Sequence, residues 1–387
     1  MKNIKLLNKI ARIGLDNFNL DEYCLGDNIN NPDGIMVRSA DMLSMEFNPE
    51  LKAIARAGAG VNNIPVEKCA DQGIVVFNTP GANANGVKEL AVAALLLASR
   101  NISGGIEWAK AQAGKEGVAK LVEKEKSKFA GIEIQGKTLG VIGLGAIGGM
   151  VANIAKSLGM EVIGYDPYIT IENAWHLSRA IKKATDYDEI YRTADFITVH
   201  IPATDTTRGM FNAETFAKMK DGVRFINLSR ADLVNTKDMI AAVKAGKVAC
   251  YVTDFPTDDN VNVDDRIITI PHLGASTEES EDNCAVMAAR QLIEYLETGN
   301  ITNSVNFPSC SMPHSGDARI CVLHKNIPNM LAQISGAVSA ENVNIINMLN
   351  RSKKEYAYTI MELEGSIPEN AVDKLSKLDG VIRVNCY

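Results

Sequence analysis

Short apolar runs alternate with amphipathic helical segments through the first three quarters of the chain. In the first hundred residues four of these runs predict strands, at Ile10–Ile13, Gly34–Val37, Ala53–Ala55 and Ile74–Phe77. Beyond residue 137 six more follow, at Thr138–Ile142, Glu161–Tyr165, Asp195–Val199, Val223–Asn227, Val248–Thr253 and Arg266–Ile270. Because strands that alternate with helices form parallel sheets covered by helices, the pattern predicts an α/β fold.

Three segments between or after these strands have a clear helical pattern. Asn83–Asn101 is apolar around most of its circumference, so we expect a buried helix. Residues 102–132 are charged and lack a broad apolar stripe, which leaves open a solvated helix and an arm used in dimerisation. A helix is also expected at Thr277–Glu297, with Thr277 as its N-cap and Gly299 beyond its end.

The pattern changes after Ser304–Gly316, a segment with Pro308 and Pro313 that predicts a linker. Strands are expected at Arg319–Leu323, Ile345–Leu349, Tyr356–Glu362 and Val381–Asn385, and helices at Pro328–Ala340 and Glu369–Leu378. The order βαββαβ predicts a small antiparallel sheet with two helices on one face.

Composition narrows the functional classes. The chain has 387 residues, enough for two or three domains, and a net charge of −7 with a pI near 5.4. An acidic balance argues against nucleic acid and against an anionic membrane surface as partners. The seven cysteines form no C-x-x-C pair and no zinc-like spacing with histidine, so we expect no metal site and a cytoplasmic protein with reduced thiols. No secretory signal is evident at the N-terminus.

A glycine pattern, G-x-G-x-x-G, follows the strand at Thr138–Ile142. Gly143 permits a tight turn, Gly145 lets the backbone approach a pyrophosphate, and Gly148 lets the following helix pack against the strand. The helix expected from Ile147 to Leu158 offers free N–H groups at its start. This arrangement predicts a dinucleotide-binding site.

Asp166 ends the next strand, about 20 residues beyond the glycines, where a carboxylate accepts hydrogen bonds from a ribose 2′-hydroxyl. A carboxylate would repel a 2′-phosphate. The sequence therefore favours NAD over NADP.

Residues that can do chemistry follow the strands, and the carboxyl ends of parallel strands meet at one edge of a sheet. The six strand ends carry Gly143, Asp166, His200, Arg230, Asp254 and His272. His272 lies between Pro271 and Gly274 on a loop that can enter a cleft, and it is our candidate acid/base. His200 precedes Ile201 and Pro202, which favours a structural role under a nicotinamide.

Arginines and acids complete this candidate site. The guanidinium of Arg230 can hold a carboxylate through two hydrogen bonds, and Asp254 can face the nicotinamide carboxamide. A carboxylate that orients His272 has several candidates in the preceding loop: Asp254, Asp258, Asp259, Asp264 and Asp265. Arg38 and Arg56 each follow a strand of the first sheet and are candidate anion ligands. Together these groups suit the oxidation of a 2-hydroxy acid.

Eight stretches carry a resemblance to a known family: VRS at 37–39, RAGAGVNN at 56–63, NTPGANANGVKELAVA at 78–93, GLGAIG at 143–148, GYDP at 164–167, VHIPATDTTRGM at 199–210, NLSR at 227–230 and PHLGAST at 271–277. Over residues 10–305 the chain resembles the D-isomer-specific 2-hydroxyacid dehydrogenases. The resemblance implies a flavodoxin-like substrate domain (1–97 with 280–305), a Rossmann-type NAD-binding domain (98–279) and an ACT-type, ferredoxin-like domain (316–387).

By this resemblance Arg230, His272 and an acid are catalytic. The family's glutamate, five residues beyond the strand-end aspartate, falls on Asp259, with Asp258 as the rival. The implied NAD contacts are Gly143, Gly145, Ala146, Ile147, Gly148, Asp166, His200, Ile201, Pro202, Leu228, Ser229, Asp254 and Gly274. The implied substrate contacts are Arg38, Arg56, Ala57 and Gly58.

Two arginines on the substrate domain favour a phosphorylated 2-hydroxy acid. A dehydrogenase for an unphosphorylated acid such as lactate or glycerate remains open, as does a non-catalytic NAD sensor. The tail RICVLHKNIPNMLAQIS resembles ACT-type amino-acid-sensing domains. It implies a homo-oligomer, dimer or tetramer, that binds serine through His324, Asn326 and Asn344. Asn329 stands where that family usually has glycine, so a purely structural, oligomerising tail also remains open.

Overall fold

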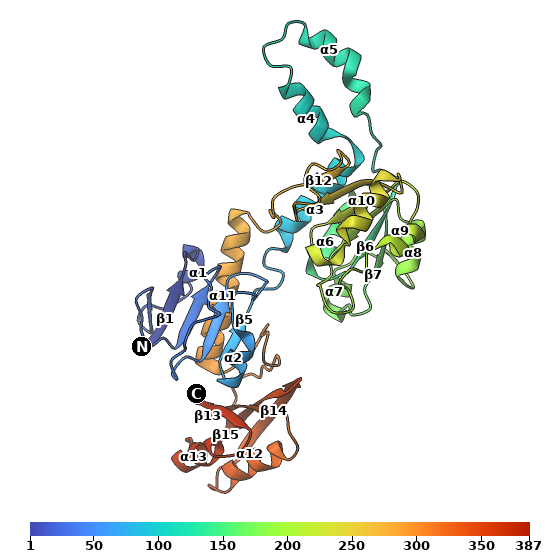
Figure 1. Cartoon of the computed structure of the whole chain (residues 1–387). Helices are drawn as coiled ribbons and strands as arrows, with labels where there is room; N and C mark the ends of the chain where they lie inside the picture. The colour runs from blue at the N-terminus through green and yellow to red at the C-terminus, as the bar shows by residue number, and fades with distance from the viewer. The chain divides into compact units, whose positions relative to one another are not determined.

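A computed structural model describes all 387 residues, which divide into two compact units. Unit 1 comprises Met1–Asn83 and Glu281–Tyr387, and unit 2 comprises Ala84–Ser280 (Figure 1). The finer domain limits given above, at residues 97, 280, 305 and 316, stay predictions.

The first sheet of unit 1 is parallel and five-stranded, in the order β2-β1-β3-β4-β5. Its strands are β1 (Lys2–Leu7), β2 (Tyr23–Gly26), β3 (Gly34–Val37), β4 (Ala53–Arg56) and β5 (Val75–Phe77). The order 2-1-3-4-5 is that of flavodoxin-like folds, which confirms the fold class expected for the substrate domain.

The predicted strand at Ile10–Ile13 is wrong, because Arg12–Leu15 forms the short helix α1. The strands that were missed are β1 and β2. Lys2 and Lys5 interrupt the apolar run of β1, and only Ile4 of its six residues is fully buried, so the run lacks the continuous apolar signal of a buried parallel strand. Ile10 is buried as a loop residue.

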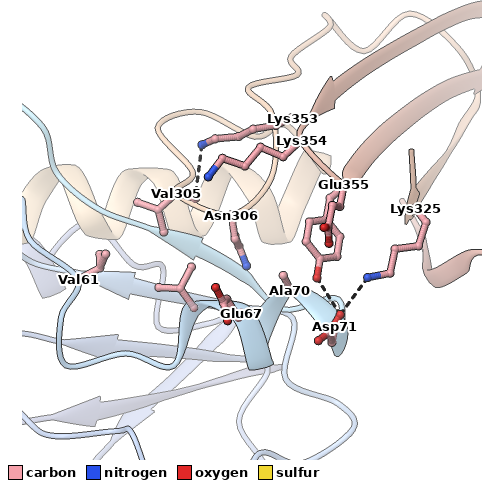
Figure 2. Close-up of a pocket in the computed structure, with 12 residues that line it drawn as sticks. Val61, Glu67, Ala70, Asp71, Val305, Asn306, Lys325, Lys353, Lys354 and Glu355 are labelled. Carbon is pink, nitrogen blue, oxygen red and sulfur yellow. Dashed lines mark hydrogen bonds and ion pairs between the residues drawn. The ribbon is translucent and has the colours of Figure 1, made fainter. Parts of the chain in front are cut away.

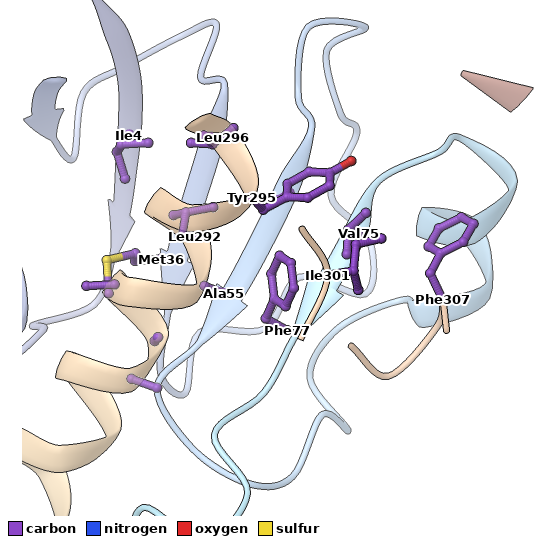
Figure 3. Packing of buried hydrophobic residues seen from close by; sticks show 14 of the residues in the cluster. Ile4, Met36, Ala55, Val75, Phe77, Leu292, Tyr295, Leu296, Ile301 and Phe307 are labelled. Carbon is purple, nitrogen blue, oxygen red and sulfur yellow. The ribbon is translucent and has the colours of Figure 1, made fainter. Parts of the chain in front are cut away.

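Helix α11 (Glu278–Thr298) covers this sheet, and the expected N-cap is confirmed because Thr277 Oγ1 accepts from the Ser280 amide at 3.1 Å. Figure 3 shows Leu292, Tyr295 and Leu296 of α11 packed against side chains of the sheet. Phe77 and Tyr295 meet edge to face, with ring centroids 5.7 Å apart. A further helix, α2 (Val66–Asp71), precedes β5.

Unit 2 contains a seven-stranded parallel sheet in the order β12-β11-β10-β9-β6-β7-β8. Its strands are β6 (Thr138–Ile142), β7 (Glu161–Tyr165), β8 (Lys182–Lys183), β9 (Phe196–Val199), β10 (Val223–Asn227), β11 (Val248–Thr253) and β12 (Ile267–Thr269). Counted from β6, the first six follow the Rossmann order 3-2-1-4-5-6, which confirms that prediction. The sequence pattern missed β8 because it consists of two exposed lysines.

The helices of unit 2 are α3 (Ala84–Ser99), α4 (Ile102–Lys110), α5 (Val118–Glu125), α6 (Ala146–Ser157), α7 (Ile171–Trp175), α8 (Tyr187–Thr193), α9 (Ala213–Lys218) and α10 (Thr236–Lys244), with 3₁₀ turns at Lys126–Phe129 and Ala231–Leu233. Helix α3 packs into the core, as expected. Helices α4 and α5 bury no residue, so both interpretations of residues 102–132 stay open.

No helix by itself has the length and apolar character needed to cross a membrane; only α3 and α4 together, bent by 75°, meet that test.

The C-terminal part of unit 1 is the predicted βαββαβ domain. An antiparallel sheet in the order β14-β15-β13-β16 carries two helices. The elements are β13 (Ala318–Lys325), α12 (Met330–Ser339), β14 (Ile345–Lys353), β15 (Tyr356–Leu363), α13 (Glu369–Ser376) and β16 (Val381–Cys386).

A buried ion pair fixes this domain to the end of α11. Arg319 and Glu362 are fully buried and in contact. Arg319 also donates to the Thr298 carbonyl at 2.6 Å and to the Met312 carbonyl at 2.8 Å. Burial acts to raise the pKa of Glu362, but bonds from the Gly316 and Ser315 amides and from Arg319 outweigh it, so the pKa is lowered. The segment predicted as a linker is therefore held in place.

Replacing Arg319 with alanine should destabilise the C-terminal domain strongly, because Glu362 would be left as a buried, uncompensated charge. Removing one partner of a buried ion pair lowers the free energy of unfolding by about 3–5 kcal/mol. Urea unfolding of the Arg319→Ala variant measures the loss. Arg351→Ala is the matched control, since Arg351 is exposed on β14. Equal, small effects of both changes would contradict the assigned role.

Candidate active site

The glycine turn after β6 has the geometry that a dinucleotide site requires. Gly143 has a φ of +88°, and a Cβ there would lie 2.5 Å from the His200 carbonyl oxygen. A Cβ on Gly148 would lie 1.9 Å from the Gly143 carbonyl oxygen, so helix α6 and the turn pack as closely as expected. A Cβ on Gly145 would meet nothing within 4 Å. Gly145 is thus the glycine whose open side is left for a ligand.

Asp166 lies beside this turn, at the end of β7, with a fixed and half-buried carboxylate. Its Oδ2 accepts from the Leu144 amide at 2.9 Å and its Oδ1 from the Tyr168 amide at 2.8 Å. Because a carboxylate oxygen can accept more than one hydrogen bond, both oxygens retain capacity for hydroxyl groups. This placement fits the ribose contact expected of Asp166.

His200 supports the turn instead of offering a free base. Its amide donates to the Ile142 carbonyl at 2.7 Å, and its Nε2 lies 3.0 Å from Thr198 Oγ1. Burial lowers the pKa of His200 to about 4, so the imidazole is neutral at neutral pH. The carbonyl of the next residue, Ile201, accepts from Ser229 Oγ at 2.6 Å, which ties this loop to the one after β10.

Arg230 is exposed on the loop after β10, and Asn227 positions that loop. Asn227 is fully buried; its Oδ1 accepts from the Ser229 amide at 3.1 Å, and its Nδ2 donates to the Arg230 carbonyl at 2.8 Å. Arg230 itself donates from Nη1 to the Ser229 carbonyl at 2.7 Å. Asn227 was not among the predicted site residues. An asparagine at the end of an apolar strand is the signal that could have revealed it, since asparagine commonly bonds the backbone of a turn.

Asp254 is fully buried after β11, and neither carboxylate oxygen has a hydrogen-bond partner. Burial raises the pKa of Asp254, and attraction to His272 and the nearby Gly274 amide oppose the shift. A buried polar group without a partner is costly, so a ligand that donates N–H groups would be favoured here. The amide of a nicotinamide carboxamide is such a donor. Asp254 and the open side of Gly145 are the two observations that fit NAD.

His272 lies on an exposed loop, and its ring packs edge to face against Phe255 with centroids 5.0 Å apart. No carboxylate lies within 4.0 Å of its ring nitrogens, although the Asp254 carboxylate is near enough to be attracted to it; the only histidine with a carboxylate within 4.0 Å is His314, beside Glu362. Asp258 and Asp259 are both exposed. The choice of catalytic acid therefore stays a prediction.

The loop that carries these two acids is held by Asn260, which sequence reasoning missed. Asn260 is buried; its Oδ1 accepts from the Thr257 amide at 2.7 Å and its Nδ2 donates to the Phe255 carbonyl at 3.1 Å. The backbone that carries Asp258 and Asp259 is thus pinned at both sides.

In unit 1, Arg38 and Arg56 follow β3 and β4 as expected, but they differ in what they contact. Arg56 donates to the carbonyls of Arg38 at 3.0 Å and of Gly60 at 2.5 Å, and burial lowers its pKa. It therefore holds the loop that contains Ala57 and Gly58. Arg38 is 43% exposed and pairs with Glu281 at 2.5 Å. Of the two guanidinium groups, that of Arg38 is the one available to an anion, and Glu281 is the group that an anion would displace.

The residues expected to bind serine lie on the C-terminal domain. Both ring nitrogens of the buried His324 have partners, Nδ1 with the Lys325 carbonyl at 2.8 Å and Nε2 with Thr359 Oγ1 at 3.0 Å. Asn326 donates to the Lys354 carbonyl at 3.2 Å, and Asn344 donates to Glu364 at 3.1 Å. Asn329 has a φ of +67°, which explains why glycine is usual there. The serine site stays a prediction.

The Rossmann sheet, its glycine turn and the strand-end residues define an NAD-binding dehydrogenase fold. Residues 92–275 match the family described as "D-isomer specific 2-hydroxyacid dehydrogenase, NAD binding domain". A D-3-phosphoglycerate dehydrogenase from Methanocaldococcus jannaschii is 35% identical over 354 residues, which cover 89% of this chain and 64% of that protein. One from Escherichia coli is 30% identical over 379 residues, which cover 94% of this chain and 89% of that protein. The chain therefore belongs to the D-isomer-specific 2-hydroxyacid dehydrogenase family, and its cofactor is NAD.

A solved structure supports the same assignment. The NAD⁺-bound 3-phosphoglycerate dehydrogenase of Entamoeba histolytica matches with a TM-score of 0.60 and 26% identity, over 79% of this chain and 98% of that chain. The chain spans 64% of the length of the Methanocaldococcus relative, and 52% and 54% of the lengths of two further curated relatives.

The glycines predict two different mutational effects. Gly145→Ala should fold normally, because its Cβ meets nothing, and should weaken NAD binding at least about tenfold, or about 1.4 kcal/mol, by blocking the pyrophosphate. Gly148→Ala should instead lower the free energy of unfolding by about 1–3 kcal/mol, because it overpacks the turn. Fluorescence titration with NADH and urea unfolding measure the two effects. Unchanged NADH affinity in Gly145→Ala would exclude the pyrophosphate from this glycine.

Proposed function

We propose that the protein catalyses the NAD-dependent oxidation of D-3-phosphoglycerate to 3-phosphohydroxypyruvate, the first step of L-serine biosynthesis. The observation that carries the proposal is the unpartnered, buried carboxylate of Asp254, in the same unit as Arg230 and His272. The names of the relatives support the choice of substrate, as does the exposed guanidinium of Arg38.

The proposed roles follow from what each side chain can do. NAD, when bound, supplies the hydride acceptor. His272 accepts the proton of the substrate hydroxyl, and Phe255 supports its ring. Arg230 binds the substrate carboxylate through two hydrogen bonds, and Arg38 binds the phosphate. Asp259, or its rival Asp258, stabilises the protonated His272.

A non-catalytic NAD sensor is the second candidate, because no carboxylate lies within 4.0 Å of His272 to orient it. Dehydrogenases for unphosphorylated acids such as lactate or glycerate share the fold and remain the alternative within the enzymes. The proposal further includes a cytoplasmic homo-oligomer with serine as an effector.

The proposal is tested by following NADH formation from NAD with D-3-phosphoglycerate, D-glycerate and D-lactate, and by repeating the assay with NADP. Turnover should be highest with D-3-phosphoglycerate and NAD. His272→Asn should abolish turnover, because the proton acceptor is lost, while NADH still binds. NADH binding without turnover of any of the three acids in the wild type would instead support the sensor.

Arg38 and Glu281 should affect the Michaelis constant in opposite directions. Arg38→Ala removes the proposed phosphate ligand and should raise KM for D-3-phosphoglycerate by at least about tenfold, with little effect on D-glycerate. Glu281→Gln removes the competing carboxylate and should lower that KM. Arg12→Ala is the matched control, because Arg12 is an exposed arginine whose only ion pair is to Asp16. An equal change of KM for both acids in Arg38→Ala would remove the phosphate role.

A further inference from the structure

A pocket of about 930 Å³ lies within unit 1, and none of the residues assigned to catalysis lines it. It is lined by the turn between β14 and β15, by the end of β13, by α2 and by the Val305–Asn306 segment (Figure 2). Charged side chains dominate its polar lining: Glu67, Asp71, Lys325, Lys353, Lys354 and Glu355.

On one side of the pocket, the charges of the lining residues Asp71 and Lys325 neutralise each other. Asp71 accepts from Lys325 Nζ at 3.0 Å and from the Tyr356 hydroxyl at 2.7 Å. The same ammonium lies 4.2 Å from the centroid of the Tyr356 ring. The bonds from Tyr356 and Lys325 lower the pKa of Asp71, so this carboxylate stays charged and this side needs no ligand.

The other side carries two ammonium groups without a counter-ion. Lys353 is partly buried and donates to the carbonyls of Ser304 and Val305, each at 3.0 Å. An ammonium has three N–H groups, so one remains for a ligand. Burial lowers the pKa of Lys353, and the neighbouring charge of Lys354 adds to the effect. Lys354 has a φ of +55°, and Figure 2 shows its side chain extending beside that of Lys353.

Neither lysine has a carboxylate within 4.0 Å, although Glu67 and Glu355 also line the pocket and are exposed. A simple anion would neutralise the lysines but would place its charge near those two glutamates. A ligand with a carboxylate and an ammonium group would complement both. We propose that this pocket binds a small zwitterion of the α-amino-acid type, with its carboxylate on Lys353 and Lys354 and its ammonium on Glu67 or Glu355.

None of the residues expected to bind serine, His324, Asn326 and Asn344, lines this pocket, although Asn326 donates to the backbone carbonyl of Lys354 at 3.2 Å. The pocket has a route to the proposed substrate site. Val61 lines the pocket, and the preceding residue, Gly60, provides the carbonyl that Arg56 binds. An occupied pocket is therefore expected to change KM for the phosphorylated acid, a consequence that depends on the proposed function.

Binding itself is tested without catalysis, by isothermal titration of the full chain with each of the proteinogenic amino acids and with propionate, which lacks the ammonium group. We expect at least one amino acid to bind and propionate to bind more weakly. Lys354→Gln should weaken amino-acid binding about tenfold, and it cannot unfold the chain through a lost contact because the Lys354 side chain makes no hydrogen bond or ion pair. Lys377→Gln, at another exposed lysine of the same domain, should change nothing.

Two results would overturn the proposal. One is that no amino acid binds at millimolar concentration while NADH still does. The other is that Asn344→Ala abolishes binding and Lys354→Gln does not, which would place the ligand at the site expected from the sequence. Since neither readout uses turnover, the proposed function can fail without affecting this result.

Discussion

The candidate chemistry depends on one constraint, the parallel register of four strands in unit 2. Ile142, Val199, Asn227 and Thr253 pair with one another in turn across β6, β9, β10 and β11. The residues that follow them therefore leave the sheet side by side, and they are Gly143, His200, Leu228 and Asp254. A shift of one residue in any of these pairs would turn the following side chain to the other face. The turn geometry, the half-buried His200 and the unpartnered Asp254 all follow from this register.

Much of the fold could be read from the sequence because the deciding interactions are local. A strand inside a parallel sheet is a continuous apolar run, which the sequence shows directly. Glycines are also visible in the sequence where a tight turn or a close contact requires them, as at Gly143 and Gly148. The pattern did not predict β1 and β8, because these strands are partly or fully exposed and carry lysines where a buried strand has apolar residues. The ACT-type tail was predictable in outline for the same reason, and Asn329 adopts the positive φ that its position demands.

The partners of the site residues could not be read in this way. Arg38 and Arg56 look alike in the sequence, since each follows a strand, yet one holds backbone carbonyls and the other meets Glu281, which is 243 positions away. Asn227 and Asn260 fix the loops of Arg230 and of the candidate acids through bonds that no spacing rule encodes. The orientation of His272 depends on contacts of the same kind, so the sequence could propose His272 as the base but could not choose its acid.

The C-terminal domain connects to the rest of unit 1 through buried polar groups instead of a flexible tether. Arg319 binds carbonyls at the end of α11 and in the segment that follows, and the Tyr358 hydroxyl donates to the Gly299 carbonyl at 2.7 Å. Breaking such contacts is costly because the partners would be left buried and unsatisfied. A ligand at the β14–β15 turn would thus act on a body that is continuous with the loop of Arg56. Lys353, the last residue of β14, already donates to the Val305 carbonyl in the segment after α11. Rigid attachment, more than proximity, would be the physical basis of the proposed influence of this tail on substrate binding.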